Sequence, residues 1–133
     1  MSRENFAAKL AGVLNLLNLS LSPEEVELMD QLDRLLIKWN RSINLIGFKS
    51  EAERFEKYFV EALHAAQILP VTGQAIDIGS GGGTPALPLA IFRRGIEWTL
   101  IEPNKKKGIF LEEAIALLGL RNIEVRREKY VGY

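Results

Sequence analysis

Apolar residues in the first half of the chain recur at intervals of three and four, the spacing of helices that bury one face. This pattern predicts three helices, at about 6–17, 23–43 and 51–69. The second helix opens with Ser22-Pro23-Glu24-Glu25. A capping serine, a proline at the first helical position and a glutamate three residues after the cap together form a strong start signal. We therefore expect a helical N-terminal region.

In the second half, short apolar runs alternate with segments that suit helices. We expect strands at 74–78, 98–102 and 123–127 and helices at 85–92 and 105–118. Asn104 is a cap for the last helix and Gly119 its stop. Strands that alternate with helices through short connections favour a parallel sheet with right-handed crossovers. The sequence therefore predicts a doubly wound α/β fold, with a helical region at 1–70 and an α/β half-domain at 71–133.

Composition excludes several kinds of chemistry. The 133 residues include no cysteine, which excludes disulfides, iron–sulfur clusters, thiolate zinc sites and cysteine nucleophiles. Seventeen basic and 17 acidic residues give a net charge of zero, so any contact with RNA must be focal. No apolar run approaches the roughly 20 residues that span a bilayer, and the first residues lack the features of a signal peptide. We expect a cytoplasmic protein that does not enter a membrane.

A glycine loop between the first predicted strand and the next helix is the most informative segment. It reads Asp77-Ile78-Gly79-Ser80-Gly81-Gly82-Gly83-Thr84-Pro85. Four glycines in five residues allow a sharp turn and let a ligand approach the main chain. Glu102 ends the next predicted strand, and the carboxyl ends of adjacent parallel strands open on one crevice. A carboxylate there can accept hydrogen bonds from both ribose hydroxyls, so the pattern predicts a nucleoside site.

Two details favour one nucleoside over another. A dinucleotide fingerprint, Gly-x-Gly-x-x-Gly/Ala, would need glycine or alanine where Thr84 stands. Asp77 would repel a pyrophosphate, whereas it would attract the ammonium and sulfonium groups of S-adenosylmethionine. The methyl donor is therefore favoured. A nicotinamide cofactor and a glycine-rich turn that binds no ligand stay open as alternatives.

The glycine loop and its flanks resemble a known family. The loop continues as Ala86-Leu87-Pro88-Leu89-Ala90-Ile91, and Thr99-Leu100-Ile101-Glu102 and Lys106-Lys107 follow. In this order the segments are similar to the bacterial small-subunit ribosomal RNA guanine-N7 methyltransferases, also called glucose-inhibited division protein B. Upstream, Trp39-Asn40-Arg41-Ser42-Ile43-Asn44-Leu45-Ile46 resembles that family's Trp-Asn-x-x-x-Asn-Leu-Thr segment. The similarity runs from about Leu32 to about Val125 and covers the front of a typical member.

This resemblance implies an S-adenosylmethionine-dependent enzyme that methylates guanine N7 of small-subunit (16S) ribosomal RNA. It implies a Rossmann-like class I methyltransferase sheet, with the first three strands in this chain. The residues it assigns to the cofactor are Asp77, Gly79, Ser80, Gly81, Gly83, Thr84, Glu102, Asn104 and Glu128. N7 carries no proton, so the reaction needs positioning and electrostatics more than a general base, and no catalytic residue or metal ligand is assigned. A noncatalytic nucleotide-binding or interaction module is the alternative.

The sequence also departs from that family and leaves a sheet edge open. Tyr58-Phe59-Val60-Glu61-Ala62-Leu63 stands where the family usually has His-x-x-Asp-Ser-Leu. In the family's sheet the first strand is central, so a chain with three strands would leave one edge of strand 74–78 unpaired. The rest of a longer protein, another chain or the N-terminal helices must cover that edge. We therefore expect self-association through it as one possibility.

Other notable residues are expected to have ordinary roles. His64 is predicted to be a partly exposed helix residue. Lys105-Lys106-Lys107 fits a solvated surface, although cations in a first helical turn oppose the helix dipole and hint at nearby phosphates. Trp39 and Trp98 are expected in the core rather than as stacking platforms for bases.

Overall fold

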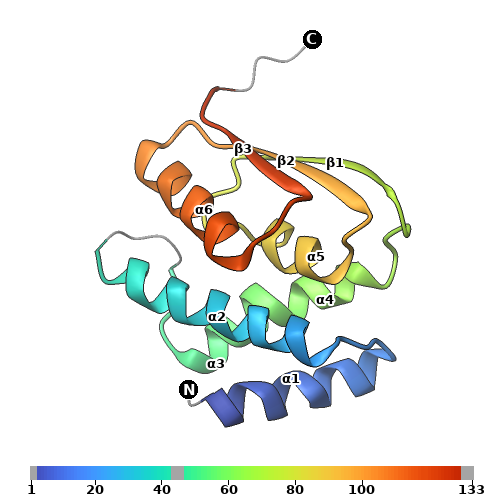
Figure 1. Ribbon diagram of the computed structural model, residues 1–133. Coiled ribbons are helices and arrows are strands. Elements are labelled where there is room, and N and C mark those ends of the chain that lie inside the picture. Colours follow the sequence, from blue (N-terminus) through green and yellow to red (C-terminus); the bar gives the residue numbers. More distant parts are fainter. Residues whose placement is uncertain (1–2, 43–46, 130–133) are drawn as a thin grey trace.

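Helices lie in layers beneath a three-stranded sheet (Figure 1). The computed structural model describes residues 3–42 and 47–129. The N-terminal elements are α1 (Arg3–Leu17), α2 (Pro23–Asn40), α3 (Glu51–Arg54), the π-helical segment η1 (Phe55–Val60) and α4 (Glu61–Ala66). The elements that follow are β1 (Gly73–Ile78), α5 (Ala86–Phe92), β2 (Ile96–Ile101), α6 (Lys105–Leu118) and β3 (Ile123–Arg126). The expected alternation of strands and helices is confirmed.

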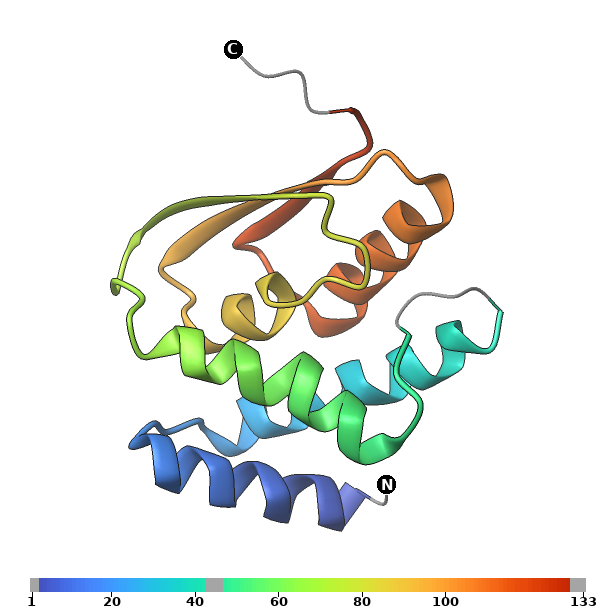
Figure 2. The same ribbon diagram turned by 180° about the vertical axis from the view of Figure 1, so that it is seen from behind.

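The sheet is parallel, in the order β1-β2-β3. Ala75 of β1 pairs with Trp98 of β2, which pairs with Ile123 of β3. Both crossover helices, α5 and α6, cover the same face of the sheet (Figures 1 and 2). Helices on both faces, as a doubly wound sheet requires, are not present in the described part of the chain. Because successive strands are added in one direction, right-handed crossovers place both helices on one side.

The N-terminal helices pack beneath α5 and α6 (Figure 2). The predicted start of α2 is confirmed: Ser22 Oγ accepts a hydrogen bond from the Glu25 amide, and Glu25 Oε1 accepts one from the Ser22 amide. The apolar stripes of α1 and α2 are buried, for example at Leu10 and Leu32. Each such side chain stabilises the fold by roughly 1.5–3 kcal/mol. One core contains residues from both the N-terminal region and the α/β region. The predicted end of α2 at Ile43 lies outside the described residues.

The third predicted helix is interrupted by a wider turn. Helical backbone runs from Glu51 to Ala66 rather than to 69, and its middle, η1, is π-helical. The predicted stripe is buried at Phe55, Phe59, Leu63 and Ala66. Periodicity did not predict the π turn, since one wide turn leaves the apolar spacing almost unchanged. Such turns are rare and often lie at functional sites.

One prediction about α6 is wrong, and its predicted start and end are confirmed. Leu117, expected to point inward, is 53% exposed. It lies at the margin of the stripe formed by Phe110, Ala114 and Leu118, where no other element covers it. The cap and the stop are confirmed, because Asn104 Oδ1 accepts a hydrogen bond from the Lys107 amide and Gly119 adopts a left-handed φ of 63°.

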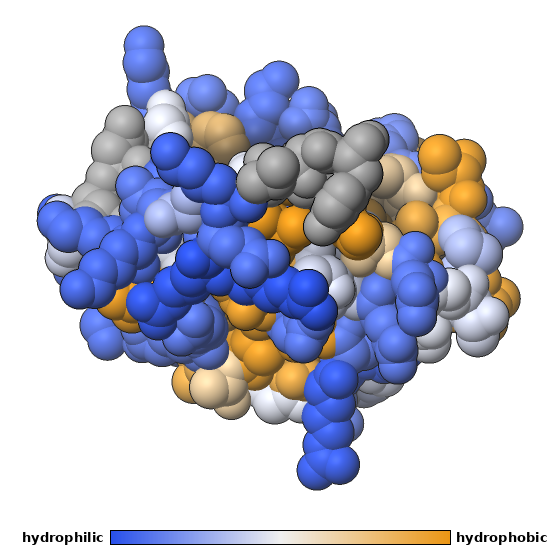
Figure 3. All heavy atoms as spheres, turned by 90° about the horizontal axis from the view of Figure 1, so that it is seen from above, coloured by the Kyte–Doolittle hydropathy of each residue, from blue (hydrophilic) through white to orange (hydrophobic). Residues whose placement is uncertain are grey.

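One edge and one face of the sheet are open. β1 is an edge strand of the described sheet, as expected, and its Ile76 and Ile78 are 66% and 53% exposed. The view onto this face shows hydrophobic surface interrupted by hydrophilic residues (Figure 3). Self-association through this edge stays a prediction. Among the described residues, no helix is both long and apolar enough to cross a bilayer.

Candidate functional site

The glycine loop connects the carboxyl end of β1 to α5. The Gly79 amide donates a hydrogen bond to the Ile101 carbonyl at 2.8 Å, and the Gly83 amide donates one to the Ser80 carbonyl at 2.8 Å. Gly79 and Gly81 have φ values of 71° and 55°, the left-handed region that favours glycine. A Cβ on Gly79 would meet nothing within 4 Å. The loop therefore presents backbone beside open space.

Glu102 joins this loop to the end of β2. Its side chain is buried, and Oε1 accepts a hydrogen bond from the Gly81 amide at 2.6 Å. Oε2 accepts one from the Asn104 amide at 3.0 Å. The structure thus brings together the glycine loop and the acidic strand end, as the sequence predicts. A carboxylate has about four lone-pair sites, so Glu102 keeps capacity for a ligand's hydroxyl groups.

Asp77 lies in β1 at the base of the loop, and one of its carboxylate oxygens receives no hydrogen bond from the described residues. Its Oδ2 is buried and accepts no hydrogen bond from any residue in the described ranges. Burial raises the pKa of Asp77, the nearby Ser80 side chain lowers this pKa, and the Glu102 charge raises it further. A buried acceptor next to a second carboxylate is stabilised by a cation. These residues therefore fit an adenosine derivative with a positively charged group.

Ser80 and Gly83 shape the loop from inside. Ser80 is buried, and its hydroxyl donates a hydrogen bond to the Asp77 carbonyl at 3.2 Å. A Cβ on Gly83 would lie 2.5 Å from a Leu87 methyl carbon and 2.9 Å from one of Leu111. Gly83 therefore allows close packing of the loop on α5 and α6. The predicted cofactor contacts of both residues stay predictions.

The remaining predicted residues are Thr84, Asn104 and Glu128. The Thr84 hydroxyl donates to the Tyr58 carbonyl at 2.8 Å, and the Asn104 side chain caps α6. Glu128 is exposed beyond β3. Cofactor contacts by these three residues also stay predictions. His64 is exposed on α4, as expected.

Tyr58 is a structural part of the site that the sequence did not predict. It is fully buried in η1, and its hydroxyl donates to the Gly82 carbonyl at 2.6 Å. Burial, and secondarily the Asp33 charge, raise the pKa of Tyr58, so the hydroxyl stays protonated and able to donate. With the bond from Thr84, η1 is attached to the loop at two points. The sequence did carry one signal for this role, because Tyr58 stands at the position where the related family usually has histidine.

A parallel sheet with a glycine loop after its first strand and an acid after its second defines a Rossmann-like class. A solved structure of coclaurine N-methyltransferase, described as bound to N-methylheliamine and SAH, has this fold. It matches with a TM-score of 0.51 and 19% identity, over 96% of this chain and 43% of that one. The predicted Rossmann-like sheet preceded by helices is therefore confirmed.

Sequence comparison narrows this class to a family. The model of the family described as rRNA small subunit methyltransferase G matches residues 25–130. The chain belongs to this family, as its motifs predict. Proteins named ribosomal RNA small subunit methyltransferase G include one from Dictyoglomus thermophilum, 39% identical over 92% of this chain and 52% of that relative. Another, from Nitrosococcus oceani, is 38% identical over 98% of this chain and 59% of that relative. The chain thus spans somewhat more than half the length of these relatives.

Proposed function

We propose that the protein is an S-adenosylmethionine-dependent methyltransferase that acts on guanine N7 of small-subunit ribosomal RNA. Membership of the family supports the reaction and the RNA substrate. The observation that carries the proposal is the hydrogen bond from the Gly81 amide to the Glu102 carboxylate. Asp77, whose buried Oδ2 receives no hydrogen bond from the described residues, lies at the base of the same loop. A ribosomal RNA substrate also means that the protein works in the cytoplasm.

Each residue of the site has a positioning role in this proposal. Asp77 holds the donor's ammonium group, Glu102 accepts hydrogen bonds from the ribose hydroxyls, and the backbone at Gly79 and Gly81 approaches the methionine portion. The bound donor supplies a methyl group made electrophilic by the sulfonium. Guanine N7 presents a lone pair without a proton, so the protein has no proton to remove at that atom. Orientation and the exclusion of water are therefore the main contributions of these residues.

The other predicted contacts complete the cofactor site in this proposal. Ser80, Gly83, Thr84 and Asn104 hold the loop and the strand end in shape through the bonds and packing described above. Glu128 approaches the adenine from the segment after β3. We assign no catalytic residue.

The second candidate is a noncatalytic module that binds the donor without transferring its methyl group. The contacts between the glycine loop and Glu102 serve donor binding whether or not the methyl group is then transferred. A nicotinamide cofactor is disfavoured, because Asp77 already has an unmet acceptor and a carboxylate neighbour.

These alternatives are tested by calorimetry of the purified chain with S-adenosylhomocysteine and with NAD. An assay of methyl transfer to undermethylated small subunits follows. The proposal predicts heat with S-adenosylhomocysteine, none with NAD, and label from the donor in the RNA. Glu102→Gln should weaken S-adenosylhomocysteine binding about tenfold or more, since it removes charge-assisted hydrogen bonds. Glu124→Gln, the same change on an exposed β3 residue, is the matched control.

Binding without transfer supports the noncatalytic module, and heat with NAD alone contradicts both. Equal losses of affinity in the Glu102 and Glu124 variants would contradict the assigned role of Glu102.

A further inference from the structure

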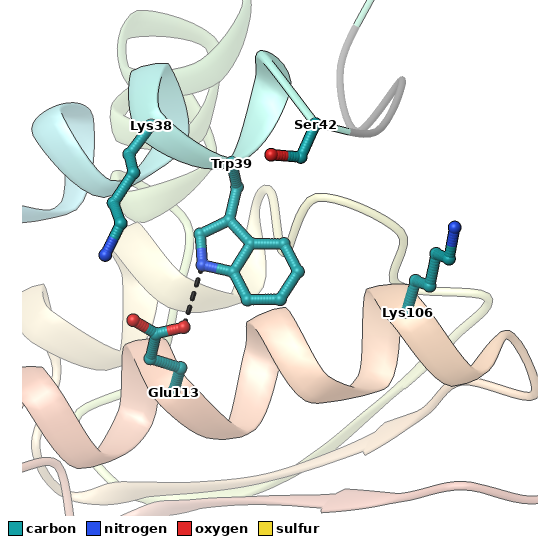
Figure 4. Close-up of a pocket in the computed structure, with 5 residues that line it drawn as sticks. All are labelled: Lys38, Trp39, Ser42, Lys106 and Glu113. Carbon is teal, nitrogen blue, oxygen red and sulfur yellow. Dashed lines mark hydrogen bonds between the residues drawn. The ribbon is translucent and has the colours of Figure 1, made fainter.

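A separate pocket lies between α2 and α6 (Figure 4). It has a volume of about 430 Å³. The residues that line it are Lys38, Trp39, Ser42, Lys106 and Glu113. None of these residues belongs to the cofactor site described above. We call this cavity the Trp39 pocket.

Trp39 presents a fixed aromatic ring to this pocket. Its indole Nε1 donates a hydrogen bond to Glu113 Oε2 at 2.8 Å. Its ring meets Phe110 edge-to-face, with 5.8 Å between centroids and 72° between planes. Trp39 packs against the core, as expected, but its side chain is only partly buried and also lines this cavity. A ring already held on two sides loses little entropy when another flat group stacks on it.

Two lysines lie on opposite sides of this indole (Figure 4). Lys38 projects from α2 and Lys106 from the first turn of α6, and both are exposed. Neither makes an ion pair with any residue of the described ranges. Glu113 keeps lone pairs after it accepts the indole hydrogen bond. An aromatic face, two cations and a carboxylate acceptor match the base, the phosphates and the base-edge N–H groups of a nucleotide.

The position of α6 relates this pocket to the cofactor site. α6 begins at Lys105, three residues after Glu102, so Lys106 lies at the same end of the sheet as the glycine loop. The chain has no net charge, which makes contact with RNA a matter of focal cations. A strand of RNA that presents one nucleotide at the cofactor site can therefore have another near α6.

We propose that the Trp39 pocket binds one unstacked nucleotide of an RNA strand. The base stacks on the Trp39 indole, Lys38 and Lys106 contact the flanking phosphates, and Glu113 accepts a hydrogen bond from an N–H group on the base edge. This proposal rests on the proposed function for the choice of RNA as ligand.

Tryptophan fluorescence tests it directly. The chain has two tryptophans, so Trp98→Phe leaves Trp39 as the single reporter. Titration of this variant with a mixed-sequence RNA hexamer should quench the fluorescence saturably. In fluorescence anisotropy with labelled hexamer, Trp39→Leu should weaken binding by roughly tenfold or more, the typical loss when a stacking residue is removed. The anisotropy measurements use the unaltered chain as reference and do not depend on the Trp98 variant.

A matched pair of lysine variants tests the phosphate contact. Lys106→Gln should weaken hexamer binding and reduce the slope of log affinity against log salt by about 0.7, the value for one phosphate contact on a single strand. Lys105→Gln removes the same charge from the same helical turn, but Lys105 does not line the pocket. It should have a smaller effect on both quantities.

Three results would overturn the proposal. They are the absence of quenching by RNA, equal affinity for an inorganic polyphosphate of the same charge, and equal losses in the two lysine variants. Calorimetry of the same Trp98→Phe protein with S-adenosylhomocysteine separates the two proposals. Binding of S-adenosylhomocysteine without quenching by RNA contradicts the Trp39 pocket alone, and quenching without such binding contradicts the proposed function alone.

Discussion

At the scale of single residues, Asp77 has the most unusual environment in the site. Its carboxylate is half-buried, its Oδ2 is unmet within the described ranges, and Glu102 lies close enough to raise its pKa. Because the folded-state pKa is above the unfolded value, the free energy of unfolding falls as pH rises from the ordinary carboxyl value toward the raised one. Asp77 therefore reduces the stability of the fold at neutral pH, and a bound cation reverses that effect.

The substitution Asp77→Asn should accordingly have opposite effects on stability and binding. We expect a higher melting temperature at pH 7, because the desolvated charge is gone, and about tenfold weaker binding of S-adenosylmethionine. In the unaltered protein, affinity should fall as pH decreases through the raised pKa of Asp77, above the ordinary carboxyl value of about 4. In the variant this step should be absent. Calorimetry across pH, with thermal melts, measures both effects; a variant with unchanged affinity and the same pH profile would contradict the role.

At the scale of elements, the π-helical segment η1 holds the glycine loop in place. Tyr58→Phe keeps the buried ring but leaves the Gly82 carbonyl without its hydrogen bond. We expect the free energy of unfolding to fall by about 1–3 kcal/mol, as for a buried group left unsatisfied. Thr84→Val should have a smaller effect in the same direction, and Thr72→Val, at an exposed position, should have almost none. Urea unfolding measures all three, and equal stability of the Tyr58 and Thr72 variants would contradict this function of η1.

Local signals in the sequence predicted most elements, and tertiary contacts explain the rest. The cap at Asn104 and the stop at Gly119 define α6 correctly because both signals act within a few residues. The meeting of Gly81 and Glu102 was predictable, since parallel topology places adjacent carboxyl ends at one edge. The bond from Tyr58 to Gly82 spans 24 residues, so no local pattern contains it. Trp39 has a helical spacing that suits a core position, yet the packing of α2 on α6 leaves a cavity beside it.

At the scale of the whole molecule, the helices cover one face of the sheet and the site lies at its carboxyl edge (Figures 1 and 2). The residues of the site come from the loop after β1 and from the end of β2, and Tyr58 of η1 is hydrogen-bonded to that loop. The open face and the edge of β1 are not needed for this arrangement. Binding of the donor should therefore be a local property of the glycine loop and its acidic partners.

The most direct test is a backbone amide NMR spectrum of the chain titrated with S-adenosylhomocysteine. The largest shifts should belong to Gly79 and Gly81, whose amides and neighbouring space form the site. Amides of α1, such as Leu10 and Leu14, should stay unchanged and report that the fold is intact. Saturable shifts confined to the glycine loop and the end of β2 are the predicted result. A spectrum that does not change, or changes only at residues far from Gly81 and Glu102, would contradict the assignment of this site.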